Sequence, residues 1–135
     1  MKRRKIRSLS VSEIGMGCMG FSHGYGQVPG AGYAEEAIRE AFGYGCNFFD
    51  TAEGYGKELY YPGHNEEIVG RAVRGFRNEV VIATKLHIRP EAVEDCGSVY
   101  AAVRRHLERS LKNLQIDYVD LYYLHRINME VDNLE

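Results

Sequence analysis

Three of the residues in this chain that could take part in acid–base chemistry come directly after apolar runs of the kind that form buried strands. Asp50, Lys85 and His125 each end one such run. A fourth, Tyr55, follows in the loop five residues after Asp50. In parallel α/β folds the carboxyl ends of strands meet at the ligand site. We therefore expect a carboxylate, a phenol, an ammonium group and an imidazole to lie together.

This combination suits proton delivery to a carbonyl oxygen. A free tyrosine has a pKa of about 10, which is high for acid catalysis near neutral pH, and a lysine cation beside the phenol lowers it by favouring the phenolate. In this scheme Asp50 holds Lys85 charged and aimed, and His125 donates a hydrogen bond that orients the substrate oxygen. The hydride must come from a cofactor, because no side chain supplies one.

Each of these residues also has an ordinary structural interpretation. Lys85 could be a solvated lysine after a strand, His125 a histidine that bonds to backbone, and Asp50 a cap for the loop that follows it. Tyr55, as one of ten tyrosines, indicates nothing alone. The four residues together, at three strand ends and in one adjoining loop, are a more specific sign of a catalytic site than any one of them.

The elements that must position these residues alternate along the chain. Strands are predicted at residues 11–16, 46–50, 80–84 and 119–124, and helices at 33–42, 66–76 and 99–114, with Asn65 and Ser98 as N-caps. Long loops are predicted at 21–32, 51–63 and 86–97, and no element is predicted in the last ten residues. This alternation predicts an α/β fold with parallel strands and right-handed crossovers.

Composition excludes several classes of function. The net charge of -2 favours neither nucleic acid nor an anionic membrane surface, and the basic cluster at residues 2–5 is expected to be a solvated end. No apolar run approaches the roughly 20 residues of a membrane helix. Three widely spaced cysteines argue against a disulfide framework and favour the reducing cytoplasm, with Cys46 in the core.

The histidines and cysteines show no spacing typical of a metal site, so none is predicted. The long third helix carries charged residues off its apolar stripe. His106 is expected to be a helix-surface residue, and Arg104, Arg105 and Arg109 to form a solvated face.

The string Gly15-Met16-Gly17-Cys18-Met19-Gly20 spells G-x-G-x-x-G, the dinucleotide-binding fingerprint. A glycine-rich loop follows it instead of a helix, and Asp50 ends the next strand 30 residues after Gly20 rather than about 20. We therefore expect a tight strand exit that lets backbone approach a ligand, not a Rossmann site.

Several strings together resemble the aldo-keto reductase family, and they cover nearly the whole chain in family order. They are Gly15-Met16-Gly17-Cys18-Met19-Gly20, Asn47-Phe48-Phe49-Asp50-Thr51-Ala52-Glu53-Gly54-Tyr55-Gly56, Asn65-Glu66-Glu67-Ile68-Val69-Gly70, Ala83-Thr84-Lys85 and Asp120-Leu121-Tyr122-Tyr123-Leu124-His125-Arg126. The resemblance implies the first half of a TIM (β/α)₈ barrel, with about four βα units and an N-terminal hairpin near residues 4–12. It makes residues 1–135 one incomplete domain.

The resemblance also implies NADPH as cofactor and a small-molecule aldehyde or ketone as substrate. The family tetrad falls on Asp50, Tyr55, Lys85 and His125, with the tyrosine as proton donor. Cys18 and Met19 fall on the loop that meets the nicotinamide, and Asp50 lies close to it in the family.

The chain is shorter than the family's barrel, which needs about 250 residues. By this resemblance, the residues that bind the adenosine phosphate lie outside these four βα units. The preference for NADPH over NADH is therefore set outside them as well. The loop at residues 56–64 is longer than in many family members and would border the entrance to the substrate site. The class of carbonyl substrate is therefore not determined. Two alternatives remain: a non-catalytic half-barrel that self-associates or pairs with a partner, and a metal-dependent or phosphate-binding barrel enzyme.

Overall fold

The computed structural model describes residues 1–24 and 26–131. Its strands are β1 (Arg3–Ile6), β2 (Leu9–Ser12), β3 (Met16–Gly17), β4 (Phe48–Asp50), β5 (Val81–Leu86) and β6 (Leu121–Leu124). Its α-helices are α1 (Ala31–Gly43), α2 (His64–Val73), α3 (Pro90–Cys96) and α4 (Val99–Leu114), and short 3₁₀ turns span Met19–Phe21 and Arg77–Glu79.

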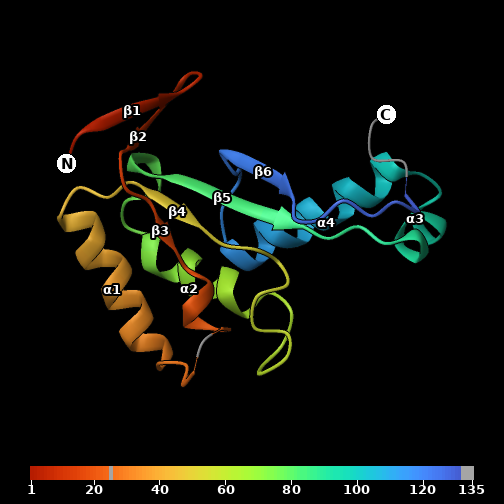
Figure 1. The fold of residues 1–135 in the computed structure, drawn as a ribbon, viewed down its shortest axis with the longest axis horizontal. Coiled ribbons are helices and arrows are strands. Elements are labelled where there is room, and N and C mark those ends of the chain that lie inside the picture. The colour runs from red at the N-terminus through yellow and green to blue at the C-terminus, as the bar shows by residue number, and fades with distance from the viewer. Residues whose placement is uncertain (25, 132–135) are drawn as a thin grey trace.

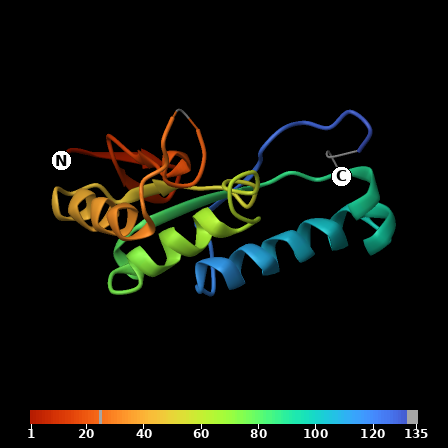
Figure 2. The same cartoon turned by 90° about the horizontal axis from the view of Figure 1, so that it is seen from below.

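Four parallel strands form the central sheet in the order β3-β4-β5-β6 (Figure 1). Helices α1, α2 and α4 lie in a row along one face of this sheet (Figure 2). The predicted α/β class and parallel strands are therefore confirmed. The strand order follows the chain order, as expected for consecutive right-handed βα units.

The hairpin expected near residues 4–12 is formed by the antiparallel pair β1 and β2. Asn47, just before β4, holds it in place. Its side-chain carbonyl accepts the Ser12 N–H at 2.6 Å, and its amide nitrogen donates to the Ser10 carbonyl at 3.0 Å. The hairpin is thus tied to the sheet at the start of β4.

Two of the predicted elements were wrong. The strand predicted at 11–16 is split, because β2 ends at Ser12 and β3 is only two residues long. The loop predicted at 86–97 contains α3, which begins with Pro90 in its first turn and ends before Gly97 in the left-handed conformation. Residues 126–131 contain no helix or strand, as expected, and residues 132–135 lie outside the described part.

The core fills the layer between the sheet and the helices. Phe49 and Ile82 point to the helix side and are fully buried with Ile38, Ile68 and Leu114. Cys46 belongs to the same cluster, as predicted. The predicted cap Ser98 accepts the Ala101 N–H at 3.1 Å. Among residues 1–24 and 26–131, no helix packs on the opposite face of the sheet, which carries the candidate site (Figure 2).

Close contact between α2 and α4 depends on a glycine. A Cβ placed on Gly70 would come within 2.1 Å of the Leu114 carbonyl oxygen, which is backbone and cannot rotate away. We predict that Gly70→Ala lowers the free energy of unfolding by about 1–3 kcal/mol or more, because the helices must move apart. Denaturant titration measures this. The control is Gly75→Ala, whose Cβ meets nothing within 4 Å; an equal loss there would contradict the argument.

Candidate active site

Asp50 and Lys85 lie on the helix-free face of the sheet. Asp50 on β4 is in register with Ala83 on β5. Lys85 is two residues beyond Ala83, so it points to the same face. The side chains of Asp50 and Lys85 are 34% and 16% exposed, so the pair is accessible from that face but partly desolvated.

The Lys85 ammonium group holds three strand-end groups together. Its Nζ donates to Asp50 Oδ1 and, at 2.7 Å, to the Thr51 carbonyl oxygen. It also lies 3.4 Å from the Tyr55 hydroxyl, at the outer limit of a hydrogen bond. The structure therefore brings Asp50, Lys85 and Tyr55 into one connected group.

His125 completes the cluster from the end of β6. Its backbone N–H donates to the Leu86 carbonyl at 2.8 Å, and its ring meets the Tyr55 ring edge to face, with 5.5 Å between centroids. Burial lowers the pKa of His125, and the nearby Lys85 cation lowers it further. The imidazole is therefore neutral at neutral pH and can donate one hydrogen bond without carrying charge.

The loop after β4 is bound to the end of β5 by backbone hydrogen bonds. The Thr51 N–H donates to the Ala83 carbonyl at 2.9 Å, and the Glu53 N–H donates to the Lys85 carbonyl at 3.2 Å. Tyr55 then follows in a turn, and its backbone N–H donates to the Ala52 carbonyl at 3.2 Å. This arrangement brings the phenol of Tyr55 back over the sheet toward Lys85.

Asn65, predicted as an N-cap, is buried inside the first turn of α2, and Gly63 occupies the cap position. The N-cap prediction was therefore wrong. The Asn65 amide joins two loops instead: its oxygen accepts from Thr51 Oγ1 at 2.6 Å, and its nitrogen donates to the Cys18 carbonyl and Ser22 Oγ, each at 2.9 Å. This framework sets the loops after β3 and β4 relative to each other.

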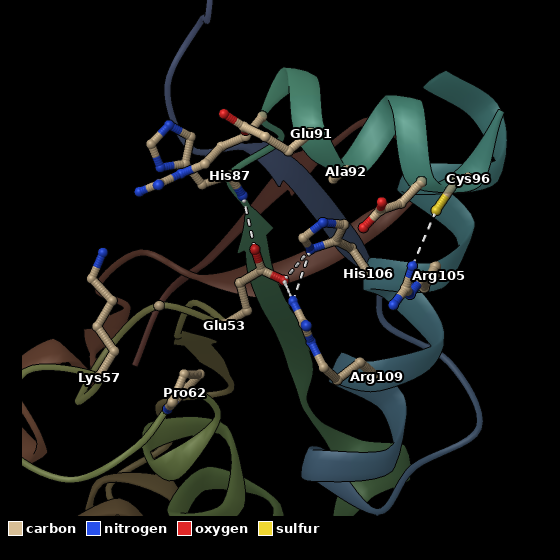
Figure 3. A pocket seen from close by; sticks show the side chains of 13 residues that line it. Glu53, Lys57, Pro62, His87, Glu91, Ala92, Cys96, Arg105, His106 and Arg109 are labelled. Atoms are coloured by element: carbon tan, nitrogen blue, oxygen red, sulfur yellow. Dashed lines mark hydrogen bonds and ion pairs between the residues drawn. The ribbon is translucent and has the colours of Figure 1, made fainter. Parts of the chain in front are cut away.

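Sequence reasoning also missed Glu53, which is 7% exposed. Its carboxylate lies among the His87 backbone N–H, the His106 ring and the Arg109 guanidinium (Figure 3). The prediction for His106 was wrong, since its side chain is 13% exposed and turned inward to Glu53. Arg109 is half-exposed but reaches Glu53 as well, so it is not simply solvated. Arg104 does lie on the solvated face, paired with Glu108.

The residues expected to meet the nicotinamide differ in accessibility. Cys18 is fully buried, and burial with the nearby Asp50 charge raises the pKa of its thiol to about 12. Its backbone N–H donates to the Asp50 carbonyl at 2.8 Å. Its side chain therefore offers no surface to a ligand, whereas Met19 is only half-buried.

The chain leaves room beside Asp50 for a flat ring. A Cβ placed on Gly17 meets nothing within 4 Å, although Gly17 pairs directly with Asp50. Both residues line a cavity of about 520 Å³ on the helix-free face of the sheet, together with Phe48 and Tyr123. The cavity at the ends of β3 and β4 has room for a flat ring beside Asp50, the carboxylate that pairs with Lys85.

Within residues 1–24 and 26–131, no helix is long and apolar enough to cross a membrane. Across the same residues no group of three or more His, Cys, Asp or Glu side chains is placed to hold a metal ion.

Comparison with known proteins places the geometry in context. The Aldo/keto reductase family profile matches residues 13–135. The uncharacterized oxidoreductase YqkF of Bacillus subtilis is 36% identical over 144 residues, which cover 100% of this chain and 42% of YqkF. The aldo-keto reductase yakc of Schizosaccharomyces pombe, whose name carries the label NADP(+), is 38% identical over 133 residues. The alignment covers 94% of this chain and 37% of yakc.

Solved structures agree with the sequence relatives. The holo form of aldo-keto reductase AKR11C1 from Bacillus halodurans superposes with a TM-score of 0.75 and 33% identity, covering 96% of this chain and 42% of that one. A Klebsiella pneumoniae aldo/keto reductase in complex with NADP and acetate gives a TM-score of 0.66 and 34% identity, covering 85% and 35%. The chain thus spans about two fifths of the length of these relatives and aligns to the first part of their TIM barrels. The chain belongs to the aldo/keto reductase family.

Proposed function

We propose that this chain forms the catalytic face of an NADPH-dependent reductase that converts an aldehyde or ketone to an alcohol. The observation that carries the proposal is the position of Lys85 Nζ, which bonds to Asp50 and lies 3.4 Å from the Tyr55 hydroxyl. A partly buried cation beside a phenol supports proton transfer from that phenol to a substrate oxygen.

Each residue then has a defined role. Tyr55 donates its hydroxyl proton to the carbonyl oxygen, and Lys85 stabilises the phenolate that remains until solvent restores the proton. Asp50 and the Thr51 carbonyl hold Lys85 in place. Neutral His125 donates a hydrogen bond to the substrate oxygen and aims it at Tyr55. NADPH, when bound, supplies the hydride that the carbonyl carbon accepts.

The residues that would hold the nicotinamide end of the cofactor are Gly17 and Met19, with Asp50 beside them. Gly17 leaves space for the ring, and Met19 offers an accessible apolar side chain. Support for NADPH comes from the relatives: yakc is named for NADP(+), and two Klebsiella pneumoniae structures contain NADP or NADPH.

The open sheet favours a second candidate function for the 135 residues taken alone. In the described sheet, β3 and β6 are edge strands with one hydrogen-bonded neighbour each. Tyr123 and Leu124 on β6 are 42% and 37% exposed. Unpaired edges with exposed apolar side chains favour association with another copy. This second candidate is a non-catalytic half-barrel that self-associates.

Two measurements separate these candidates. A complete barrel that carries this segment should consume NADPH when given a small aromatic aldehyde and form the alcohol; failure to do so across aldehydes and ketones would overturn the reductase proposal. The 135-residue chain alone should bind NADPH much more weakly in a fluorescence titration and sediment as a dimer or larger species. A well-folded monomer that binds NADPH tightly would contradict the half-barrel account.

A further inference from the structure

We propose that Glu53 is a positioning residue that clamps the end of β5 to the loop at residues 51–63, which carries Tyr55 and is called the catalytic loop below. In this way Glu53 sets the distance between Lys85 and Tyr55. This inference rests on the proposed reductase function. Glu53 lies between Asp50 and Tyr55 in the chain, and its side chain points toward His106 and Arg109 on α4 (Figure 3).

Two hydrogen bonds join Glu53 to the chain at Lys85 and just after it. The Glu53 backbone N–H donates to the Lys85 carbonyl at 3.2 Å. Its Oε1 accepts the backbone N–H of His87, two residues further along, at 3.0 Å. The Glu53 carbonyl accepts the Gly63 N–H at 2.9 Å, which ties down the far end of the Tyr55 loop. One residue therefore fixes both the strand end that bears the cation and the loop that bears the phenol.

The carboxylate is held firmly in this place. Burial opposes its ionisation, but hydrogen bonds from His106 and the His87 N–H, with Arg109 assisting, outweigh burial and hold the pKa of Glu53 below its usual value. His106 Nδ1 lies 2.7 Å and Arg109 Nη2 3.1 Å from Oε2. Oε2 is thus anchored to α4 while Oε1 holds the strand, so α4 supports the end of β5 through Glu53.

The surrounding groups explain why a charged residue can be used here. Glu53 forms the floor of a polar cavity of about 520 Å³ between the catalytic loop, α3 and α4 (Figure 3). The other charged or titratable residues that line it are Lys57, His87, Arg89, Glu91, Asp95, Cys96, Arg105, His106 and Arg109. The Tyr122 hydroxyl and the buried Glu66 carboxyl also interact electrostatically with Glu53. His106 and Arg109 compensate the Glu53 charge directly, and the other residues that line the cavity are at least partly exposed.

The catalytic contact leaves little tolerance for movement. The Lys85–Tyr55 distance of 3.4 Å is already beyond the 2.7–3.2 Å of a typical hydrogen bond. Reacting groups need to be held within about 0.5 Å of their productive positions. Releasing the backbone of His87 would allow Lys85 to drift by such an amount without unfolding the strand, because β5 remains paired with β4 and β6 on both sides.

The test compares three variants in a complete barrel that carries this segment. Glu53→Ala removes the two side-chain anchors, to the His87 N–H and to α4, while the backbone hydrogen bonds to Lys85 and Gly63 remain. It should lower kcat by about 10- to 100-fold with little change in KM, since misplacement by about 1 Å can cost 10²-fold. Glu53→Gln keeps a carbonyl oxygen for the His87 N–H and should restore much of that loss. The matched control is Glu91→Gln, which removes an acid from the same cavity without touching the clamp and should retain wild-type kcat.

Assays at a temperature where circular dichroism shows every variant folded separate positioning from stability. In wild type the His87 amide should be protected from hydrogen exchange, and in Glu53→Ala it should exchange much faster while β5 amides stay protected. A folded Glu53→Ala with wild-type kcat, or a kcat loss that only follows the unfolded fraction, would overturn the inference. Absence of carbonyl reduction in the wild type would instead overturn the proposed function.

Discussion

Tyr55→Phe is expected to lower kcat for carbonyl reduction by at least ~10²-fold in a complete barrel that carries this segment, the low end for loss of a general acid. The substitution keeps the ring that meets His125 edge to face and removes only the hydroxyl beside Lys85. Cofactor binding should change little, because the ring and the loop stay in place. Steady-state rates with NADPH and a small aromatic aldehyde measure the effect.

A tyrosine away from the site provides the control. Tyr100 on α4 is 76% exposed. Tyr100→Phe should therefore keep most of the activity. Near-wild-type reduction by Tyr55→Phe, or equal losses in the two variants, would remove Tyr55 from the role of proton donor.

The parts of the site that the sequence predicts are those that depend on local pattern. An apolar run that stops at Asp50 or Lys85 marks a buried strand and its end, and parallel topology then brings such ends together. The spacing of Tyr55 from Asp50 adds a short loop with little freedom. For these residues, sequence order alone determines which edge of the sheet they reach.

Asn65 and Glu53 could not be assigned in this way. Their partners are 14 to 56 residues away in the chain, and nothing in the local pattern distinguishes them from an N-cap or a loop acid. The prediction for His106 was wrong for the same reason. Helical periodicity shows which residues flank the apolar stripe, but it does not show that the buried Glu53 carboxylate lies next to His106. The one available signal was Glu53 itself, a second acid three residues after Asp50.

Lys85→Met is expected to reduce turnover at least as strongly as Tyr55→Phe. It removes the cation that stabilises the phenolate and leaves the Asp50 carboxylate without its partner. Steady-state turnover with NADPH and a small aromatic aldehyde measures the loss. Lys112→Met, an exposed position on α4, serves as the control and should leave turnover unchanged.

Asp50→Asn should be milder than Lys85→Met for a structural reason. The ammonium group keeps its 2.7 Å hydrogen bond to the Thr51 carbonyl, and the asparagine side-chain oxygen can still accept from it. The ammonium group therefore remains beside Tyr55, but its position is held less firmly. If Asp50→Asn proved as harmful as Tyr55→Phe while Lys85→Met was mild, then charge at Lys85 would not drive the reaction, and Asp50 would have to act on the substrate or cofactor directly.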